Sequence, residues 1–451
     1  MNTGNILRTL RFRKKLVVYL SIVLLFKSVT AFAADEPSFK PLPLPLGEIV
    51  TYTSEQFLVP PDSLAGGDFT IAKTPPTVDF AFYPEQTYSG NPWSVWGDNI
   101  MVGDTWYSAV GDHLWNCYLY AYNPEEKKLK TVLDVKKLLK QPEGHYTPAK
   151  VHSRIDLGSD GWLYFSTHRG SSKYTTDQYF YQGDWILRFN PKTVKAEVVS
   201  HGPVGKESIP VSVLDPDRLF FYGGTQQSKL FFAYDAKKHK LLYKSAENEG
   251  PYRYMMFSKT TGYVYFLNED YAPLRRYDPE TNKITVVDTK LGLRSATMET
   301  PQGYIYTVAT RGDGRIFRFD VKTEEAQEIG NAALTGPGYK TLAYVTTIDA
   351  DPTGTYLYYC AGNAHGHSDR GGSPIVQFNV KTGEKKVLAF LYPFFEQKHH
   401  FICEGTFGSV LSPDADVLYV TWMGKRTDKE QTRRTEWYCA MTAIHIPESE
   451  R

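Results

Sequence analysis

The segment HSRIDLGSDGWLYFSTHRG, residues 152–170, carries one histidine at each end and none at its glycine turn. His152 precedes a short apolar run, and His168 with Arg169 ends the next one. An Asp-Gly turn between alternating apolar residues predicts a β-hairpin. The two ends of a hairpin lie side by side, so we expect both imidazoles at one edge of the fold. Imidazole titrates near neutral pH and can transfer protons or bind metals.

Arginine and tyrosine stand beside each other in PYRYMMF, residues 251–257. Together with histidine they suit an anionic, hydroxyl-rich ligand, because arginine pairs with carboxylate or sulfate through two hydrogen bonds. One reaction that needs this set is β-elimination from a uronic acid. Arginine neutralises the carboxylate, histidine or tyrosine removes the neighbouring proton, and a second such group protonates the departing oxygen. The predicted catalytic residues are His152, His168, Arg253 and Tyr254, and the predicted substrate-binding residues are His113, Arg169, Arg294, His400 and Trp422.

Another pair of histidines, His365 and His367, lies in NAHGHSDR, residues 363–370. Alternate residues of an extended segment point to one side, and neutral imidazole is a good metal ligand. The pair predicts a site for one divalent metal, Zn, Mn or Ca, as the only cofactor. The alternative is a Gly-rich polar loop with solvated imidazoles.

A sequence repeat predicts the elements that position these residues. An apolar strand ending in an aromatic residue, then Asn or Asp, a charged turn and a second strand recurs along the chain. Each copy follows a turn and a Tyr-rich strand, as in LGSDGWLYF. Four short strands per unit, in about seven units with a basal period near 43 residues, predict an all-β fold, a seven-bladed β-propeller. The repeated polar turn residues are Asn123, Asn190, Asp235, Asp278, Asp320 and Asn379.

The first 33 residues have the pattern of a secretory signal peptide. A basic stretch precedes an apolar run from Leu16 to Phe26, and an A-x-A cleavage pattern follows. An uncleaved anchor is the alternative. We expect a secreted or periplasmic protein with no stable membrane insertion after signal cleavage.

The remaining chain is expected to form an N-terminal segment, residues 34–90, and the propeller, residues 91–451. The last repeat ends just after its third strand, which would leave an open sheet edge. We therefore expect an N-terminal strand, from residues 48–53 or 78–83, to fill the gap and close the ring.

The histidines concentrate in one class of loop. In a propeller, the loops between second and third strands and the loops between blades lie on the same face. Nine of the eleven histidines fall in these loops, and only His239 and His445 lie elsewhere. Because function usually resides in such loops, we expect the functional site on this face. Chance accumulation of histidine in polar loops is the alternative.

Four cysteines allow three disulfide pairings in an exported protein. Cys360 and Cys403 fall near the same face of neighbouring blades. Cys117 and Cys439 fall in the third strands of the first and last blades, which are adjacent around a ring. Both disulfides are therefore predicted, subject to bond geometry.

The chain resembles the seven-bladed propeller polysaccharide lyases, namely the oligogalacturonate lyase and ulvan lyase groups. The resemblance covers the repeat over residues 90–446, the export signal and the His, Tyr and Arg content of one face. In the ulvan lyases a histidine pair with a later Tyr and Arg carries the elimination, and His152 and His168, with Tyr254 and Arg253, are similar to that set. The oligogalacturonate lyases bind a metal partly through an H-x-H, which is similar to His365 and His367.

The predicted function is that of a secreted carbohydrate-active enzyme, a polysaccharide lyase that cleaves uronic-acid-containing polysaccharide. The alternatives are a non-catalytic carbohydrate- or protein-binding propeller and a metal-dependent lactonase or hydrolase propeller. The expected partner is an acidic polysaccharide or oligosaccharide. Without residues 1–33 the chain has 45 basic and 50 acidic residues, a net charge of −5, so a nucleic-acid partner is not expected.

Overall fold

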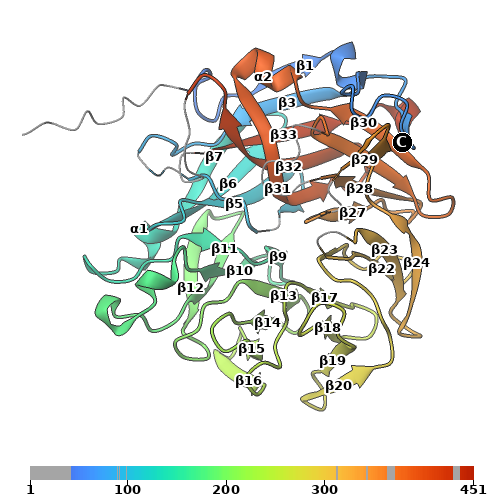
Figure 1. Ribbon diagram of the computed structural model, residues 1–451. Helices are drawn as coiled ribbons and strands as arrows, with labels where there is room; N and C mark the ends of the chain where they lie inside the picture. The colour runs from blue at the N-terminus through green and yellow to red at the C-terminus, as the bar shows by residue number, and fades with distance from the viewer. Residues whose placement is uncertain are drawn as a thin grey trace, which may run out of the picture. The chain divides into compact units, whose positions relative to one another are not determined.

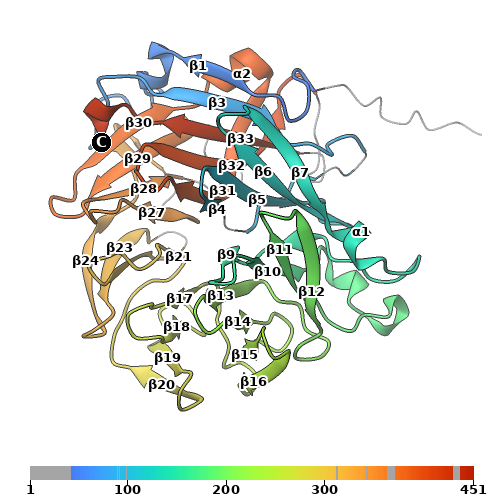
Figure 2. The ribbon, with the colours of Figure 1, turned by 180° about the vertical axis from the view of Figure 1, so that it is seen from behind.

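The computed structural model describes residues 42–88, 90, 92–97, 99–310, 313–341, 344–362, 371–429 and 437–451. Seven antiparallel sheets follow one another around a central axis, as Figures 1 and 2 show from opposite sides. The predicted seven-bladed β-propeller is therefore confirmed. Residues 1–33, with the expected signal peptide, lie outside the described residues.

The first four blades contain four strands each, with two short segments sharing the innermost position in blade 2. Blade 1 consists of β4 (Ile100–Val102), β5 (Thr105–Gly111), β6 (Cys117–Asn123) and β7 (Lys128–Asp134). Blade 2 consists of β8 (Lys150–Val151), β9 (Asp156–Leu157), β10 (Leu163–His168), β11 (Trp185–Asn190) and β12 (Lys195–His201). Blade 3 consists of β13 (Val211–Asp215), β14 (Phe220–Gly224), β15 (Phe231–Asp235) and β16 (Lys240–Lys244). Blade 4 consists of β17 (Met255–Phe257), β18 (Val264–Phe266), β19 (Leu274–Asp278) and β20 (Lys283–Val287).

The last three blades complete the ring. Blade 5 consists of β21 (Ser295–Ala296), β22 (Tyr304–Val308), β23 (Arg315–Asp320) and β24 (Glu325–Asn331). Blade 6 consists of β27 (Ile348–Ala350), β28 (Tyr356–Cys360), β29 (Pro374–Asn379) and β30 (Lys385–Phe390), and β2 (Thr70–Ile71) lies parallel to β30. Blade 7 consists of β31 (Phe401–Leu411), β32 (Val417–Arg426) and β33 (Tyr438–His445), with β3 (Thr77–Phe82) and β1 (Val50–Thr53) from the N-terminal segment.

The ring is closed by the N-terminal segment, as the sequence predicts. Strand β3 pairs with β33 along its whole length, from Thr77 opposite His445 to Phe82 opposite Ala440. Strand β1 then pairs with β3, so both predicted segments belong to blade 7, the second as its fourth strand and the first as its fifth. Closing the circle with hydrogen bonds between the two ends of the chain removes the open edge of β33.

Asp79 joins this closing strand to its neighbours. Its side chain is fully buried and accepts hydrogen bonds from Thr51 on β1, from Tyr122 on blade 1 (2.8 Å) and from His445 on β33 (3.0 Å). Lys127 adds an ion pair at 3.3 Å. Burial alone would raise the pKa of Asp79, but the hydrogen bonds outweigh it and hold the pKa well below the usual range of a carboxyl. Asp79 therefore ties three elements together as an anion.

The repeated Asn and Asp residues have a common role in the turns. The side-chain oxygen of each accepts the backbone N–H of the residue two positions later, which fixes the start of the turn. The residue four positions later has a positive φ in every copy and lies just before the outer strand. These residues are Lys127, Val194, His239, Asn282, Glu324 and Gly383, with φ between 45° and 75°.

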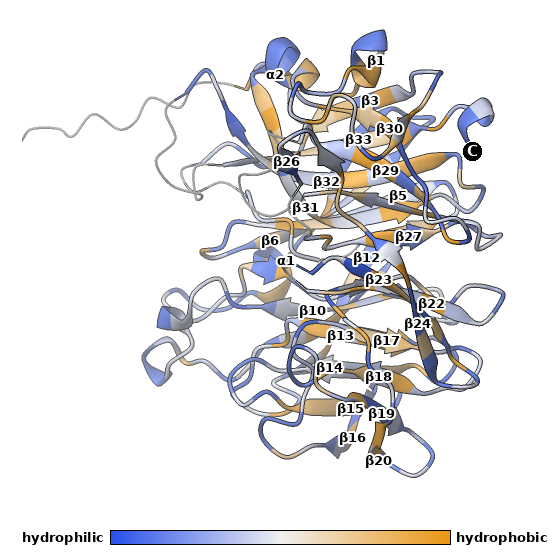
Figure 3. Ribbon diagram, turned by 45° about the vertical axis from the view of Figure 1, so that its right-hand side comes forward, coloured by the Kyte–Doolittle hydropathy of each residue, from blue (hydrophilic) through white to orange (hydrophobic). Residues whose placement is uncertain are grey.

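Apolar side chains of the strands pack between neighbouring blades, whereas the connecting loops are mostly hydrophilic (Figure 3). Alternate residues of one strand serve two different layers of this core. On β6, Cys117 and Leu119 face blade 2, while Tyr118 and Tyr120 face blade 7. The short predicted helix near residues 134–140 is α1 (Val135–Leu139), which packs in the layer between blades 1 and 2. No helix among the described residues is both long and apolar enough to cross a membrane.

The predicted disulfides are wrong, because all four cysteine side chains are buried thiols. Cys117 packs between blades 1 and 2, whereas Cys439 packs between blades 7 and 1. The two thiols therefore lie on opposite sides of the blade 1 sheet. Cys360 and Cys403 share one core layer and interact electrostatically, but no bond joins them. Burial raises the pKa of the Cys403 thiol well above its usual value, which disfavours the thiolate that forms disulfides.

We predict that Asp79→Ala lowers the free energy of unfolding by about 3 kcal/mol, because it removes the anion that His445 and Lys127 face at the closure. Asp414→Ala, on an exposed turn, is the matched control and should leave stability unchanged. Urea unfolding at pH 7 measures the difference.

The contacts of the ionised Asp79 also make the stability of the fold depend on pH. Because the pKa of Asp79 is lower in the folded chain, its contribution is present above about pH 4 and is lost as pH falls further. Asp79→Asn should therefore differ from the wild type at pH 7 and approach it in acid. A difference that stays constant with pH would contradict the assignment of a folded-state anion.

The turns yield a second stability prediction. Val194 is a β-branched residue at φ 53° and is 61% exposed, so Val194→Gly should raise the free energy of unfolding by up to about 1 kcal/mol through relief of backbone strain. Gly383→Val, at φ 75°, should lower it by a similar amount. Val198→Gly lies within β12 and should only destabilise, which separates strain relief from a general effect of glycine.

Candidate functional site

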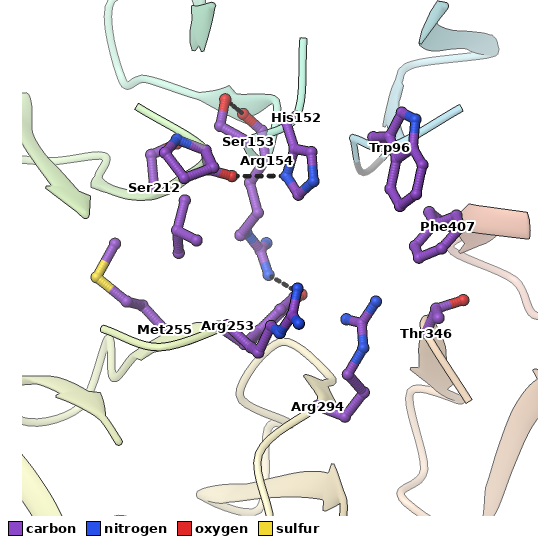
Figure 4. A pocket seen from close by; sticks show the side chains of 13 residues that line it. Trp96, His152, Ser153, Arg154, Ser212, Arg253, Met255, Arg294, Thr346 and Phe407 are labelled. Carbon is purple, nitrogen blue, oxygen red and sulfur yellow. Dashed lines mark hydrogen bonds between the residues drawn. The ribbon is translucent and has the colours of Figure 1, made fainter. Parts of the chain in front are cut away.

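All seven blades contribute a side chain to a cavity on the axis of the ring (Figure 4). Its volume is about 40 Å³, enough for a few water molecules or one charged group of a ligand. Most of the lining side chains come from segments that lead into an innermost strand, whereas His152 follows β8 and Phe407 lies within β31. The cavity therefore lies toward the face that carries the blade-to-blade loops. In ring order they include Trp96, His152, Ser212, Arg253, Arg294, Thr346 and Phe407.

His152 has a fixed orientation in this cavity. Its Nδ1–H donates to the carbonyl oxygen of Pro210 at 2.9 Å, and its ring stacks on Trp96 with centroids 5.5 Å apart. A carbonyl only accepts, so the proton lies on Nδ1 and the Nε2 lone pair of the neutral ring remains an acceptor. The ring of His168 packs edge-on against the ring of His152, with centroids 5.2 Å apart. The predicted histidine pair is therefore brought together.

Arg154 divides the channel into two parts. The innermost strand of blade 2 is interrupted between β8 and β9, and Arg154 projects inward from this break. Its guanidinium donates to the Tyr254 hydroxyl at 3.2 Å and to the Asp156 carboxylate at 3.1 Å. A second cavity, of about 270 Å³, lies on the other side and also touches Arg154 and Tyr254.

Two further arginines from neighbouring blades line the mouth. Arg294 is buried, donates from Nε to the Tyr344 hydroxyl at 2.9 Å and lies over the Phe407 ring. Arg253 is exposed over the ring of Tyr252. Within the described part of the chain, Arg253 forms no hydrogen bond or ion pair. The Asp270 carboxyl interacts electrostatically with both arginines.

A group of basic side chains, which we call the blade-2 cluster, lies beside this cavity. It consists of His113, Lys150, His168 and Arg169. Lys150 and His168 are directly opposite each other in the β8–β10 pair. Lys150 also lies over the Trp96 ring, with Nζ 5.3 Å from the centroid, and His113 stacks on Trp93 at 5.0 Å.

Close backbone packing holds the loop of His113 against this cluster. The Asp112 carboxylate accepts the backbone N–H groups of residues 114, 115 and 116, which fixes the loop after β5. His113 itself has φ 63°, and its N–H donates to Ala149. Any side chain at Gly170 would meet the carbonyl oxygen of His113, because a Cβ there would lie 2.1 Å from it. Glycine at 170 is therefore required for the approach of the loop to β10.

Burial and mutual repulsion keep these groups uncharged. Burial, together with repulsion from Lys150, lowers the pKa of His113 and of His152 to about 3. The same causes lower the pKa of His168 well below its usual value. Burial and the charge of Arg169 lower the pKa of Lys150 to about 7. At neutral pH the three imidazoles are thus neutral and Lys150 is partly deprotonated.

The structure assembles most of the predicted site residues but not all of them. His152, Arg253, Tyr254 and Arg294 line the axial cavity, and His113, His168 and Arg169 lie beside it. Trp422 is instead a core residue of β32, fully buried with its indole N–H donating to Thr442. His400 ends α2 (Phe394–His399) with φ 53° and is not among the residues that line the cavity.

The predicted metal site cannot be placed, because His365 and His367 lie outside the described residues. No group of three or more His, Cys, Asp or Glu suited to a metal occurs in the part of the chain that the structure describes. A divalent metal at residues 365–367 stays a prediction.

Several residues beside the cavity have positions that were not predicted from the sequence. Lys150 stands two positions before His152, on the same side of an extended segment, so its proximity could have been inferred from strand alternation. Trp96 and Phe407 belong to the first and last blades, and only closure of the ring brings them to blade 2.

Comparison with known proteins identifies the fold alone. No protein-family model matches the chain, and no curated protein matches it. The solved structure titled "Structure of U3-55K" aligns with a TM-score of 0.51 at 9% identity, over 78% of this chain and 96% of that chain. "Crystal structure of RRP9 WD40 repeats" aligns with a TM-score of 0.51 at 9% identity, over 79% of this chain and 95% of that chain. The chain is thus similar in fold to WD40 propellers.

The geometry of His152 yields a direct prediction for NMR. Its imidazole should show a protonated Nδ1 and an unprotonated Nε2 at pH 7, and should remain neutral down to about pH 4, because its pKa lies near 3. Long-range proton–nitrogen correlation spectra, assigned with His152→Gln, report both properties. Titration of this ring with a midpoint near the ordinary value of about 6.5 would show that the site is hydrated rather than buried.

Proposed function

We propose that the protein is a binding propeller that takes an acidic saccharide at the mouth of its channel. The observation that carries this proposal is a group of basic side chains that form no ion pair. Within the described residues, Lys150, Arg169 and Arg253 form no ion pair, although all three lie at or beside the mouth. A carboxylate or sulfate group of a ligand would supply the missing negative charge.

The polar groups of the cavity favour binding over catalysis. The Tyr254 hydroxyl accepts from Arg154 and donates to the carbonyl of Ala296 at 3.3 Å, so its proton is already engaged. His152, with a pKa near 3, is a weak base at neutral pH, whereas a general base works best with a pKa near the operating pH. Without a ligand, these groups therefore form part of a basic binding surface and do not form an acid and a base ready for proton transfer.

A polysaccharide lyase is the second candidate, and one specific observation favours it. The Nε2 lone pair of His152 belongs to a cavity that Arg253 and Tyr254 also line. In β-elimination, His152 would take the proton next to the uronate carboxylate, and the C–H electrons would form the new double bond. The glycosidic oxygen would leave with the electrons of its broken C–O bond and take a proton from the Tyr254 hydroxyl, which solvent would replace. A bound carboxylate would raise the pKa of His152 and so strengthen it as a base.

The export signal expected in residues 1–33 is consistent with a ligand outside the cytoplasm. We propose a secreted or periplasmic location on that basis, since acidic polysaccharides are extracellular materials.

Binding of acidic oligosaccharides tests the main proposal. Isothermal titration with oligogalacturonate and with a sulfated oligosaccharide should give binding that weakens with salt, and Arg253→Gln should weaken it by about ten- to a hundredfold, because one charge-assisted contact is lost. Arg318→Gln is the matched control, since Arg318 pairs with Gln327 on the outer part of blade 5. Equal binding by the wild type and Arg253→Gln, or no binding of either ligand, would refute the proposal.

The lyase candidate has a separate readout. Incubation with uronate polysaccharides would raise the ultraviolet absorbance of an unsaturated product, and His152→Gln would abolish the rise while preserving the fold. If oligosaccharides bind and no such product forms, the protein is a binding module.

A further inference from the structure

We infer that the blade-2 cluster, His113, Lys150, His168 and Arg169, is a second anion subsite, which holds one oxyanion group of the same acidic ligand. The inference rests on the proposed binding function and specifies it further. The ligand would carry at least two acidic groups, one at Arg253 and Arg294 in the axial cavity and one at the blade-2 cluster.

The backbone brings the cluster together from three places in the chain. Lys150 on β8 is paired with His168 on β10, and the Ala149 N–H donates to the His168 carbonyl at 3.2 Å. The carbonyl of Ala149 in turn accepts the His113 N–H at 3.3 Å. Paired residues on neighbouring strands point to the same side of a sheet, so the Lys150 and His168 side chains extend together.

The cluster contains polar atoms that lack partners. Lys150 is only 7% exposed, and its ammonium forms no hydrogen bond or ion pair within the described residues; it lies over the Trp96 ring. His168 is 4% exposed, and its Nδ1 atom is buried without a hydrogen-bond partner. Burying a polar atom without a partner costs free energy, so the Nδ1 atom of His168, beside the ammonium of Lys150, indicates a missing partner.

The carboxyl of Asp184, which lies near the blade-2 cluster, does not act as the missing partner of Lys150 and His168. Asp184 is fully buried and is engaged by Thr167 at 2.8 Å and by Tyr146 at 3.0 Å. Burial raises the pKa of Asp184 to about 7, so it is only partly charged at neutral pH. It offsets part of the repulsion between Lys150 and Arg169 but does not neutralise either of them.

A bound oxyanion would satisfy all of these groups at once. Lys150 Nζ, the Arg169 guanidinium and an N–H of His168 are donors that can converge on one carboxylate or sulfate. Two charged groups act on Lys150: Arg169 lowers its pKa and Asp184 raises it, and the anion would oppose the effect of Arg169. Lys150 would then bind a proton from solvent as the anion enters.

Wild-type protein with carbon-13 in its lysines tests this inference without any mutation. Inorganic sulfate and acetate are added separately at pH 8 and constant ionic strength, with chloride as the replaced ion. We expect the Cε resonance of Lys150, assigned with Lys150→Met, to shift toward its protonated position with sulfate, acetate or both. The more effective ion identifies the acidic group of the ligand as sulfate ester or carboxylate.

Variants then separate the subsite from the axial cavity. Lys150→Met should weaken binding of the effective ion by about tenfold or more, whereas Lys322→Met, on an exposed turn of blade 5, should not change it. Arg253→Gln should leave the Lys150 shift intact. If the wild type shows this shift but binds no oligosaccharide, only the proposed axial site is refuted. An unchanged Lys150 resonance with both ions, or equal binding by Lys150→Met, would overturn the inference of a second subsite.

Discussion

Closure of the ring by hydrogen bonds between β3 and β33 is the constraint on which the rest of the structure depends. The two strands come from opposite ends of the chain, and their pairing turns a row of seven sheets into a circle. The axial cavity exists only in that circle, since Trp96 of blade 1 and Phe407 of blade 7 are in contact across the junction. Asp79 stabilises the junction from within, because its buried charge is shared by hydrogen-bond donors from β1, blade 1 and β33.

The ring also explains the unusual electrostatics of the mouth. Every blade contributes side chains to the axial cavity, and several of these side chains are basic. The aromatic rings of Trp93, Trp96 and Phe407 exclude water from this space, so burial and repulsion suppress protonation of the histidines and of Lys150. In the free protein these side chains therefore carry little positive charge. A bound anion would favour their protonation and so increase that charge. This is the physical basis of the acidic-ligand binding that we propose.

The contrast between the predicted and observed roles of single residues has a consistent cause. His152 and His168 could be paired from sequence because a local hairpin brings them together. Trp422 was assigned to the site and is in the core, since the residues of β32 point alternately to the two sides of its sheet and Trp422 faces a core layer. The cysteines illustrate the same point: Cys117 and Cys439 lie on neighbouring blades, but Cys117 faces away from blade 7. Adjacent blades do not imply adjacent side chains.

The sequence by itself determined the number of blades, the turn chemistry and the closing strand. These are local properties, because strand alternation, Asx turns and a missing strand are each visible within one repeat. Only the tertiary structure decided which side chains meet on the axis, that Arg154 and Tyr254 divide the channel, and that Lys150 lies buried beside three imidazoles. Those relations join residues tens to hundreds of positions apart, and they are set by the packing of whole blades around a ring, which no local pattern specifies.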